Sequence, residues 1–118
     1  MPYPSNVDAG RQPVSNAGMQ GLTLSLSSLT ANANNQITFS GISTVARLIR
    51  IQNEHATTIY WKVNATASTG SASVVGPAAN SVSVEWISAE VTTLNIWVPT
   101  GGPTTLNASG GVKISAWA

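Results

Sequence analysis

The chain has 118 residues, a length typical of one domain, and a formal net charge of +1. Only 8% of the residues are Asp, Glu, Lys or Arg, against about 25% in a typical soluble domain. The scattered cations form no basic stripe, which disfavours nucleic-acid binding, and the absence of cysteine excludes disulfides, thiolate chemistry and thiol-rich zinc sites.

Residues 1–20 are predicted to form an extended arm ahead of a single domain over residues 21–118. Pro2, Pro4 and Pro13 disfavour helix, and the segment shows no strand-like alternation. Fully stretched, about 20 residues span roughly 65 Å, enough to reach a neighbouring molecule. The segment lacks the basic and apolar regions of a signal peptide, and no apolar run approaches the roughly 20 residues that span a bilayer. We therefore expect synthesis in a cytoplasm and no membrane partner.

From residue 21 onward, apolar residues recur at every second position, which is the period of a strand with one buried face. Turn-forming residues separate these runs, and no segment has a helical period. About eight short strands predict an all-β fold: an antiparallel β-sandwich or jelly roll, with a small barrel as the alternative. The predicted strands are 22–28, 36–41, 46–52, 57–63, 81–86, 92–98 and 111–118, with a weaker one at 73–75.

The alternation also predicts which side chains face the core. The predicted core positions are Leu22, Leu24, Leu26, Ile37, Phe39, Ile49, Ile51, Ile59, Trp61, Val63, Val82, Val84, Trp86, Leu94, Ile96, Val98, Val112, Ile114 and Ala116.

The stretch IQNEHATTIYWKV contains the only histidine, His55. The strand period holds up to Asn53 and resumes at Ile59, so the residues between them are predicted to be the turn of a hairpin with His55 at its exposed tip. Glu54 is the sequence neighbour of His55 in this turn, an arrangement that disfavours a hydrolase triad.

Two acidic residues, Glu85 and Glu90, are predicted to flank one turn and could lie at the separation of roughly 5 to 10 Å that a glycosidase requires. Glu85, however, is predicted to face solvent among serines. One histidine and four scattered acids also disfavour a metal site. We therefore predict no catalytic residues, no cofactor and no metal. The glycosylation sequons at Asn64 and Asn107 are interpreted as coincidental.

The aromatic residues divide into two groups. Trp61 and Trp86 fall in phase with the core, whereas Tyr60, Trp97 and Trp117 fall on the opposite phase. Outward aromatic residues are enriched at protein interfaces, which predicts a contact surface. A second buried face, produced by bulges that shift the phase, and a surface for stacking sugar rings are the alternatives.

The segments ARLIRIQNEHATTIYWKVNATAST, VGPAANSVSVEWI and VTTLNIWV resemble the small jelly-roll cement, or decoration, proteins of tailed bacteriophage heads. The resemblance spans residues 46–118. It consists of a strand ending near Asn53, an aromatic strand at Tyr60-Trp61, a segment from Pro77 to Val82, and a strand over 92–97. This is a pattern of strands and turns, and it carries no catalytic signature.

The resemblance implies a non-enzymatic virion protein, made in the host cytoplasm, that binds the capsid exterior. It would bridge neighbouring major capsid subunits as a homodimer or homotrimer. A glycan- or receptor-binding module of a phage fibre, or a carbohydrate-binding domain, is the alternative, and a secreted adhesin would have a similar composition. The predicted interface residues are Tyr3, Pro4, Arg11, Val14, Tyr60, Trp97 and Trp117.

Overall fold

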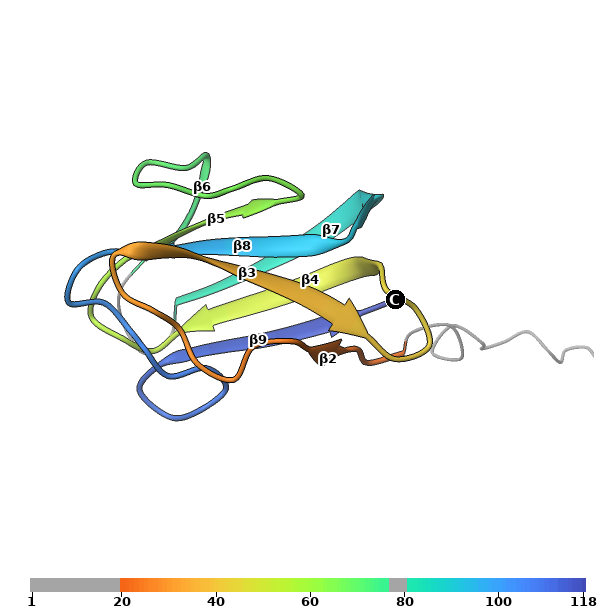
Figure 1. Ribbon diagram of the computed structural model, residues 1–118, viewed down its shortest axis with the longest axis horizontal. Helices are drawn as coiled ribbons and strands as arrows, with labels where there is room; N and C mark the ends of the chain where they lie inside the picture. The colour runs from red at the N-terminus through yellow and green to blue at the C-terminus, as the bar shows by residue number, and fades with distance from the viewer. Residues whose placement is uncertain (1–19, 77–80) are drawn as a thin grey trace, which may run out of the picture.

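Two antiparallel sheets pack face to face in the computed structural model, which describes residues 20–76 and 81–118, with the backbone alone over 81–89 (Figure 1). The larger sheet has the order β2 (Thr23–Leu24), β3 (Ala33–Ser40), β8 (Thr93–Val98), β5 (Ile59–Val63) and β6 (Ser73–Val75). The smaller sheet has the order β7 (Ser81–Val91), β4 (Ala46–Asn53) and β9 (Val112–Trp117). The predicted β-sandwich of about eight strands is confirmed. Apart from Gln20, the predicted arm lies outside the described residues.

The strands pair in a nested order. β3 pairs with β8, β4 with β7 and β5 with β6, so an antiparallel ribbon of three strand pairs is rolled across the two sheets. This is the winding of a jelly roll. Because β4 and β7 lie in one sheet and the other two pairs in the second, the roll closes around a layer of apolar side chains. No helix within the described residues has the length and apolar character needed to cross a bilayer.

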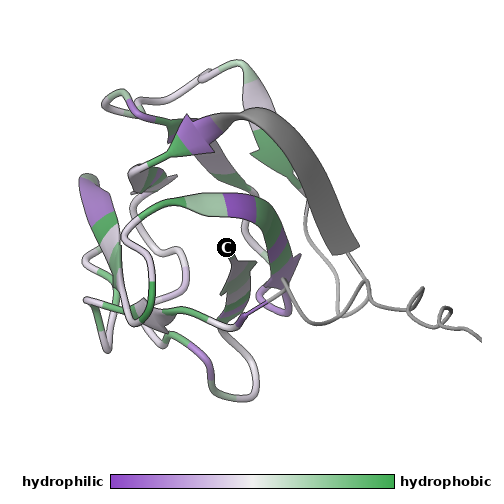
Figure 2. Cartoon of the chain, turned by 90° about the vertical axis from the view of Figure 1, so that its right-hand side faces the viewer, coloured by the Kyte–Doolittle hydropathy of each residue, from purple (hydrophilic) through white to green (hydrophobic). Residues whose placement is uncertain are grey.

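The core lies between the sheets, where successive strands contribute alternate side chains. Hydrophobic and hydrophilic residues accordingly alternate along the strands (Figure 2). Ile37, Ile49, Ile59 and Ile96 are fully buried, as the alternation predicts. The predicted core residues Leu22, Leu24, Leu26 and Val63 are only partly buried, and Val82, Val84 and Trp86 have side chains outside the described part. The loop residues Leu29, Ala67, Pro103 and Leu106 are buried although no alternation marks them.

The predicted hairpin around His55 is wrong. β4 lies in the smaller sheet and β5 in the larger one, so the residues between them cross from one sheet to the other. Their path is fixed by the buried Asn53 side chain, which accepts a hydrogen bond from the His55 N–H (3.0 Å) and donates to the Thr57 carbonyl (2.8 Å). His55 is half-buried rather than an exposed tip residue. A change of sheet and a tight turn interrupt the strand period in the same way.

The prediction that Glu85 and Glu90 flank one turn is also wrong, because both lie within the continuous strand β7. The chain turns instead at Thr92, between β7 and β8, and changes sheet there. Asn64, at φ 56°, holds this corner. Its side chain accepts a hydrogen bond from the Thr92 N–H (2.8 Å) and donates one to the Glu90 carbonyl (2.9 Å). The side-chain amide of Asn64, the asparagine of the first glycosylation sequon, therefore stabilises this corner through its hydrogen bonds.

Candidate functional site

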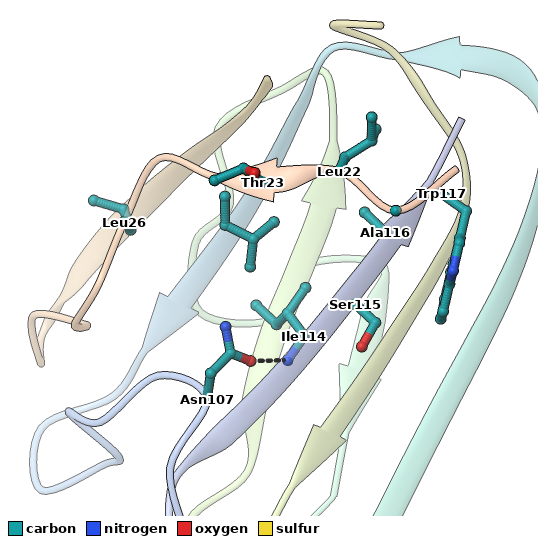
Figure 3. Close-up of a pocket in the computed structure, with 10 residues that line it drawn as sticks. Leu22, Thr23, Leu26, Asn107, Ile114, Ser115, Ala116 and Trp117 are labelled. Carbon is teal, nitrogen blue, oxygen red and sulfur yellow. Dashed lines mark hydrogen bonds between the residues drawn. The ribbon is translucent and has the colours of Figure 1, made fainter. Parts of the chain in front are cut away.

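A groove of about 460 Å³ runs along the seam where an edge of the larger sheet meets an edge of the smaller one (Figure 3). We call it the seam groove. It lies between β2 and β9, and none of its lining residues is charged. These residues are Gly21, Leu22, Thr23, Leu24, Leu26, Asn107, Ile114, Ser115, Ala116 and Trp117.

The groove forms because the chain pairs briefly with β9 and then leaves it. The Ala118 N–H donates to the Gln20 carbonyl, and the Leu22 N–H donates to the Ala116 carbonyl, both at 2.9 Å. One residue later, Thr23 pairs with Ser40 of β3. The two edges therefore diverge after Leu22, and the sandwich stays open between them.

The floor of the seam groove is apolar and its rim is polar. Ile114 and Ala116 are buried, and the leucines of the 22–26 segment are partly buried against the core. Thr23 and Ser115 are exposed on the rim. Asn107 limits the groove at its far end, where its side-chain oxygen accepts a hydrogen bond from the Ile114 N–H at 2.8 Å (Figure 3). Such a groove fits an uncharged, extended ligand.

A second apolar feature adjoins the groove at the end of the sandwich where Gln20 enters. The start of β2, the turn between β3 and β4, and the C-terminus all lie at this end (Figure 1). Ile42, in that turn, is 77% exposed, and a Cβ placed at the preceding Gly41 would be 3.8 Å from the Leu22 side chain. Three apolar side chains lie at this end: Leu22, Ile42 and Trp117. We call the surface that they form the Gln20 end, because the chain enters the domain there at Gln20.

Trp117 is half-buried and pairs in register with Leu48 of β4. Its ring lies on the side of β9 away from Leu26 and Asn107 (Figure 3). The alternation of β9 requires this, since Ile114 and Ala116 face the core. Trp117 therefore presents a partly exposed aromatic ring beside the apolar seam, on the outward phase predicted from the sequence.

Tyr60 and Trp97 form a separate aromatic site on the larger sheet. They are directly opposite each other in the β5–β8 pairing, and Val74 follows in the same row on β6. Both aromatic residues are half-buried, while Val74 is 54% exposed. The structure thus brings two of the predicted interface residues together and places Trp117 in the other sheet. Tyr3, Pro4, Arg11 and Val14 lie outside the described residues.

The connection between β5 and β6 crosses this aromatic row. Its Ala67 N–H donates a 3.0 Å hydrogen bond to the Asn34 side chain on β3, so the loop must pass over β8 to reach that strand. Ala67 is 1% exposed, and the Trp97 indole nitrogen is buried without a hydrogen-bond partner in the described part. The loop therefore covers part of the outer face of β8.

His55 and Glu54 make contacts that stabilise the loops around them. The His55 ring nitrogen Nδ1 accepts a hydrogen bond from the Thr57 N–H at 3.1 Å. The Glu54 carboxylate lies 3.2 Å from the Lys113 ammonium and accepts a 3.0 Å hydrogen bond from the Gly110 N–H. Among the described side chains, those of residues 20–76 and 90–118, no three His, Asp or Glu gather where they could hold a metal ion.

The hydrogen bond from the Gly110 backbone lowers the pKa of Glu54 below its ordinary value of 4.5, and the Lys113 side chain lowers it further. A carboxylate with a lowered pKa stabilises the fold above that ordinary value, and this contribution is lost as the pH falls through the folded-state pKa. Glu54→Gln should therefore be less stable than the parent protein at pH 7, and the difference should shrink below about pH 4.5. Urea unfolding at pH 7 and pH 3 measures it.

Glu90→Gln is the matched control for this measurement. Glu90 lies 3.4 Å from the Arg47 guanidinium, but both side chains are more than half exposed. An exposed pair of this kind contributes little to stability. A Glu54→Gln difference that stays constant from pH 7 to pH 3 would contradict the assignment.

Sequence reasoning missed the seam groove and Ile42. Leu22, Leu24 and Leu26 alternate as the core-facing side chains of a strand would, so their pattern does not distinguish an open seam from a closed core. Ile42 did carry a signal, because a large apolar residue stands among turn-formers in SGIST.

No family model, curated protein or solved structure matches the chain.

Proposed function

We propose that this protein is a non-enzymatic decoration protein that binds the outside of a bacteriophage capsid and stabilises the shell. Its Gln20 end and the N-terminal segment joined there would contact the major capsid protein. The resemblance of residues 46–118 to the jelly-roll cement proteins supplies the class of partner. The structure supports the proposal through the composition of one end of the sandwich.

The observation that carries the proposal is the apolar surface of the Gln20 end. Ile42 is exposed in the turn between β3 and β4, Trp117 is half-buried at the end of β9, and both lie at the end of the sandwich where the seam groove begins at Gly21 and Leu22 (Figure 1). Exposed apolar groups that adjoin one another mark interaction surfaces, and aromatic anchors dominate the energetics of such contacts. Residues 1–19 join the domain at the same place.

The remaining chemistry of the described part is consistent with a structural role. Glu54 and Glu90 are engaged by Lys113 and Arg47, and His55 accepts a backbone hydrogen bond. The chain as a whole is almost neutral and has few charges, so neighbouring copies repel one another little. Repeated over a shell, a modest contact from each copy yields strong overall attachment.

Cosedimentation with capsids prepared without this protein tests the proposal. The full chain should sediment with the shells, and Ile42→Asp should weaken binding by about tenfold or more, because it places a charge in the apolar contact. Val74→Asp is the matched control, since Val74 is the other large, exposed apolar side chain of the described part. Failure of the full chain to bind, or equal binding by Ile42→Asp and the parent, would contradict the proposal.

The aromatic row on the larger sheet favours a second candidate, a glycan-binding module. Tyr60 and Trp97 lie side by side and are both half-buried, and the exposed Lys62 follows Tyr60 on the same face of β5. Aromatic rings beside an ammonium group can stack on and hydrogen-bond to a sugar. Binding on a glycan array that is lost in Trp97→Ala would support this function. Absence of binding by the full chain would count against it.

A further inference from the structure

We propose that the seam groove of one copy binds the N-terminal residues of a second copy, so that the protein assembles by exchange of its N-terminal segments. The inserted stretch would be PYPSNV, residues 2–7, and residues 8–19 would form the tether, which is the part of the N-terminal segment left to contact a capsid. The inference rests on the proposed function only for the expectation that copies of the protein associate.

The backbone direction at Gln20 argues against insertion of the chain's own segment. The hydrogen bonds between Leu22 and Ala116 and between Gln20 and Ala118 are antiparallel. Followed backwards from Leu22, the chain therefore runs past the C-terminal end of β9, while the open part of the groove extends the other way, towards Asn107. To enter its own groove, a copy would have to bring residues 2–7 back by a reversal within residues 8–19. The segment of a second copy meets no such constraint.

The chemistry of the seam groove matches the first seven residues. The groove has an apolar floor and no charged side chain, and MPYPSNV has no charged side chain. Pro2 and Pro4 favour an extended conformation, which lowers the entropic cost of binding in an extended groove. Tyr3 and Val7 provide apolar side chains that the floor can bury. A groove of about 460 Å³ lies within the usual size range of binding sites.

The tether is long enough to join two copies. Residues 8–19 span at most roughly 40 Å when fully extended, which exceeds the thickness of two packed sheets. The first charged side chains, Asp8 and Arg11, fall in this tether and would remain outside the apolar floor. Reciprocal insertion would give a closed dimer, and cyclic insertion would give a closed trimer.

Disulfide trapping tests the inference directly, because the natural chain has no cysteine. A Tyr3→Cys copy whose thiol is activated as a mixed disulfide is combined with a Thr23→Cys copy, in the absence of capsids. Thr23 is exposed on the rim of the groove, so the substitution leaves the core intact. We expect a covalent dimer that forms at least tenfold faster than with Lys62→Cys, an exposed position on the larger sheet.

The doubly substituted chain, Tyr3→Cys with Thr23→Cys, distinguishes the two possible sources of the segment. Cross-linked dimers or trimers on a non-reducing gel support exchange. A cross-linked monomer alone would mean that the groove holds its own segment, and a rate no faster than the Lys62→Cys control would mean that it holds neither. Either result overturns the inference. Because no capsid is present, the outcome is independent of capsid binding.

Discussion

Asn53→Ala is expected to lower the free energy of unfolding by about 3 kcal/mol, because several buried polar groups would lose their partner at once. Asn53 is fully buried at the end of β4. Its side-chain nitrogen donates to the Thr57 carbonyl (2.8 Å) and the Gly76 carbonyl (3.2 Å), and its oxygen accepts from the His55 N–H (3.0 Å). These bonds join the smaller sheet to the crossover and to the segment that follows β6. Urea unfolding followed by tryptophan fluorescence measures the change.

Gln36→Ala is the control for Asn53→Ala. Gln36 is an exposed polar residue on the outer face of β3, so its replacement should change stability by no more than about 0.5 kcal/mol. An Asn53→Ala protein as stable as the Gln36→Ala protein would show that the crossover does not depend on this side chain.

Gly111→Ala is expected to be comparably damaging, at about 3 kcal/mol or more, for a steric reason. A Cβ at Gly111 would overlap the Thr105 carbonyl and hydroxyl oxygens. The same carbonyl accepts the Val112 N–H at 3.0 Å, and the Gly111 carbonyl accepts the Glu54 N–H at 2.8 Å. The loop cannot move away without breaking hydrogen bonds at the start of β9. Urea unfolding again measures the loss.

Gly21→Ala and Gly110→Ala separate the steric effect from backbone strain. A Cβ at Gly21 would contact nothing within 4 Å, so this variant should be within about 0.5 kcal/mol of the parent. Gly110 is equally open but has φ +79°, so alanine there should cost about 1 kcal/mol. If all three variants are equally stable, the close approach at Gly111 is not a constraint on the fold.

Most strands could be predicted from the sequence because each buries one face, although the strand predicted at 22–28 is reduced to Thr23–Leu24. Leu94, Ile96 and Val98 alternate along β8 and are all buried, and the predicted weak strand at 73–75 is β6. The sheet to which each strand belongs could not be predicted, since an interruption of the alternation has the same form in a hairpin and in a crossover. Asn53 shows this difference. Its side chain is hydrogen-bonded to His55 and Thr57 in the crossover and also to Gly76, which follows β6 and which a simple hairpin turn would not reach.

The candidate site was only partly predictable. The phase of β9 correctly predicted that Trp117 lies on the outward side, and the pairing of β5 with β8 places Tyr60 beside Trp97. The path of the loop that contains Ala67 across β8 depends on a long-range hydrogen bond to Asn34, which no local pattern indicates. The seam groove likewise depends on the point at which the chain leaves β9 for β3.

We propose that this protein attaches to a capsid through its Gln20 end and the segment that enters there. The most direct test of this claim is the binding isotherm of the full chain and of a variant lacking residues 2–18 on capsids prepared without the protein. Thermal unfolding must show that the variant is folded. We predict saturable binding by the full chain and at least a hundredfold loss in the folded variant. Equal occupancy of the shell by the two proteins, or no binding by the full chain, would contradict the claim.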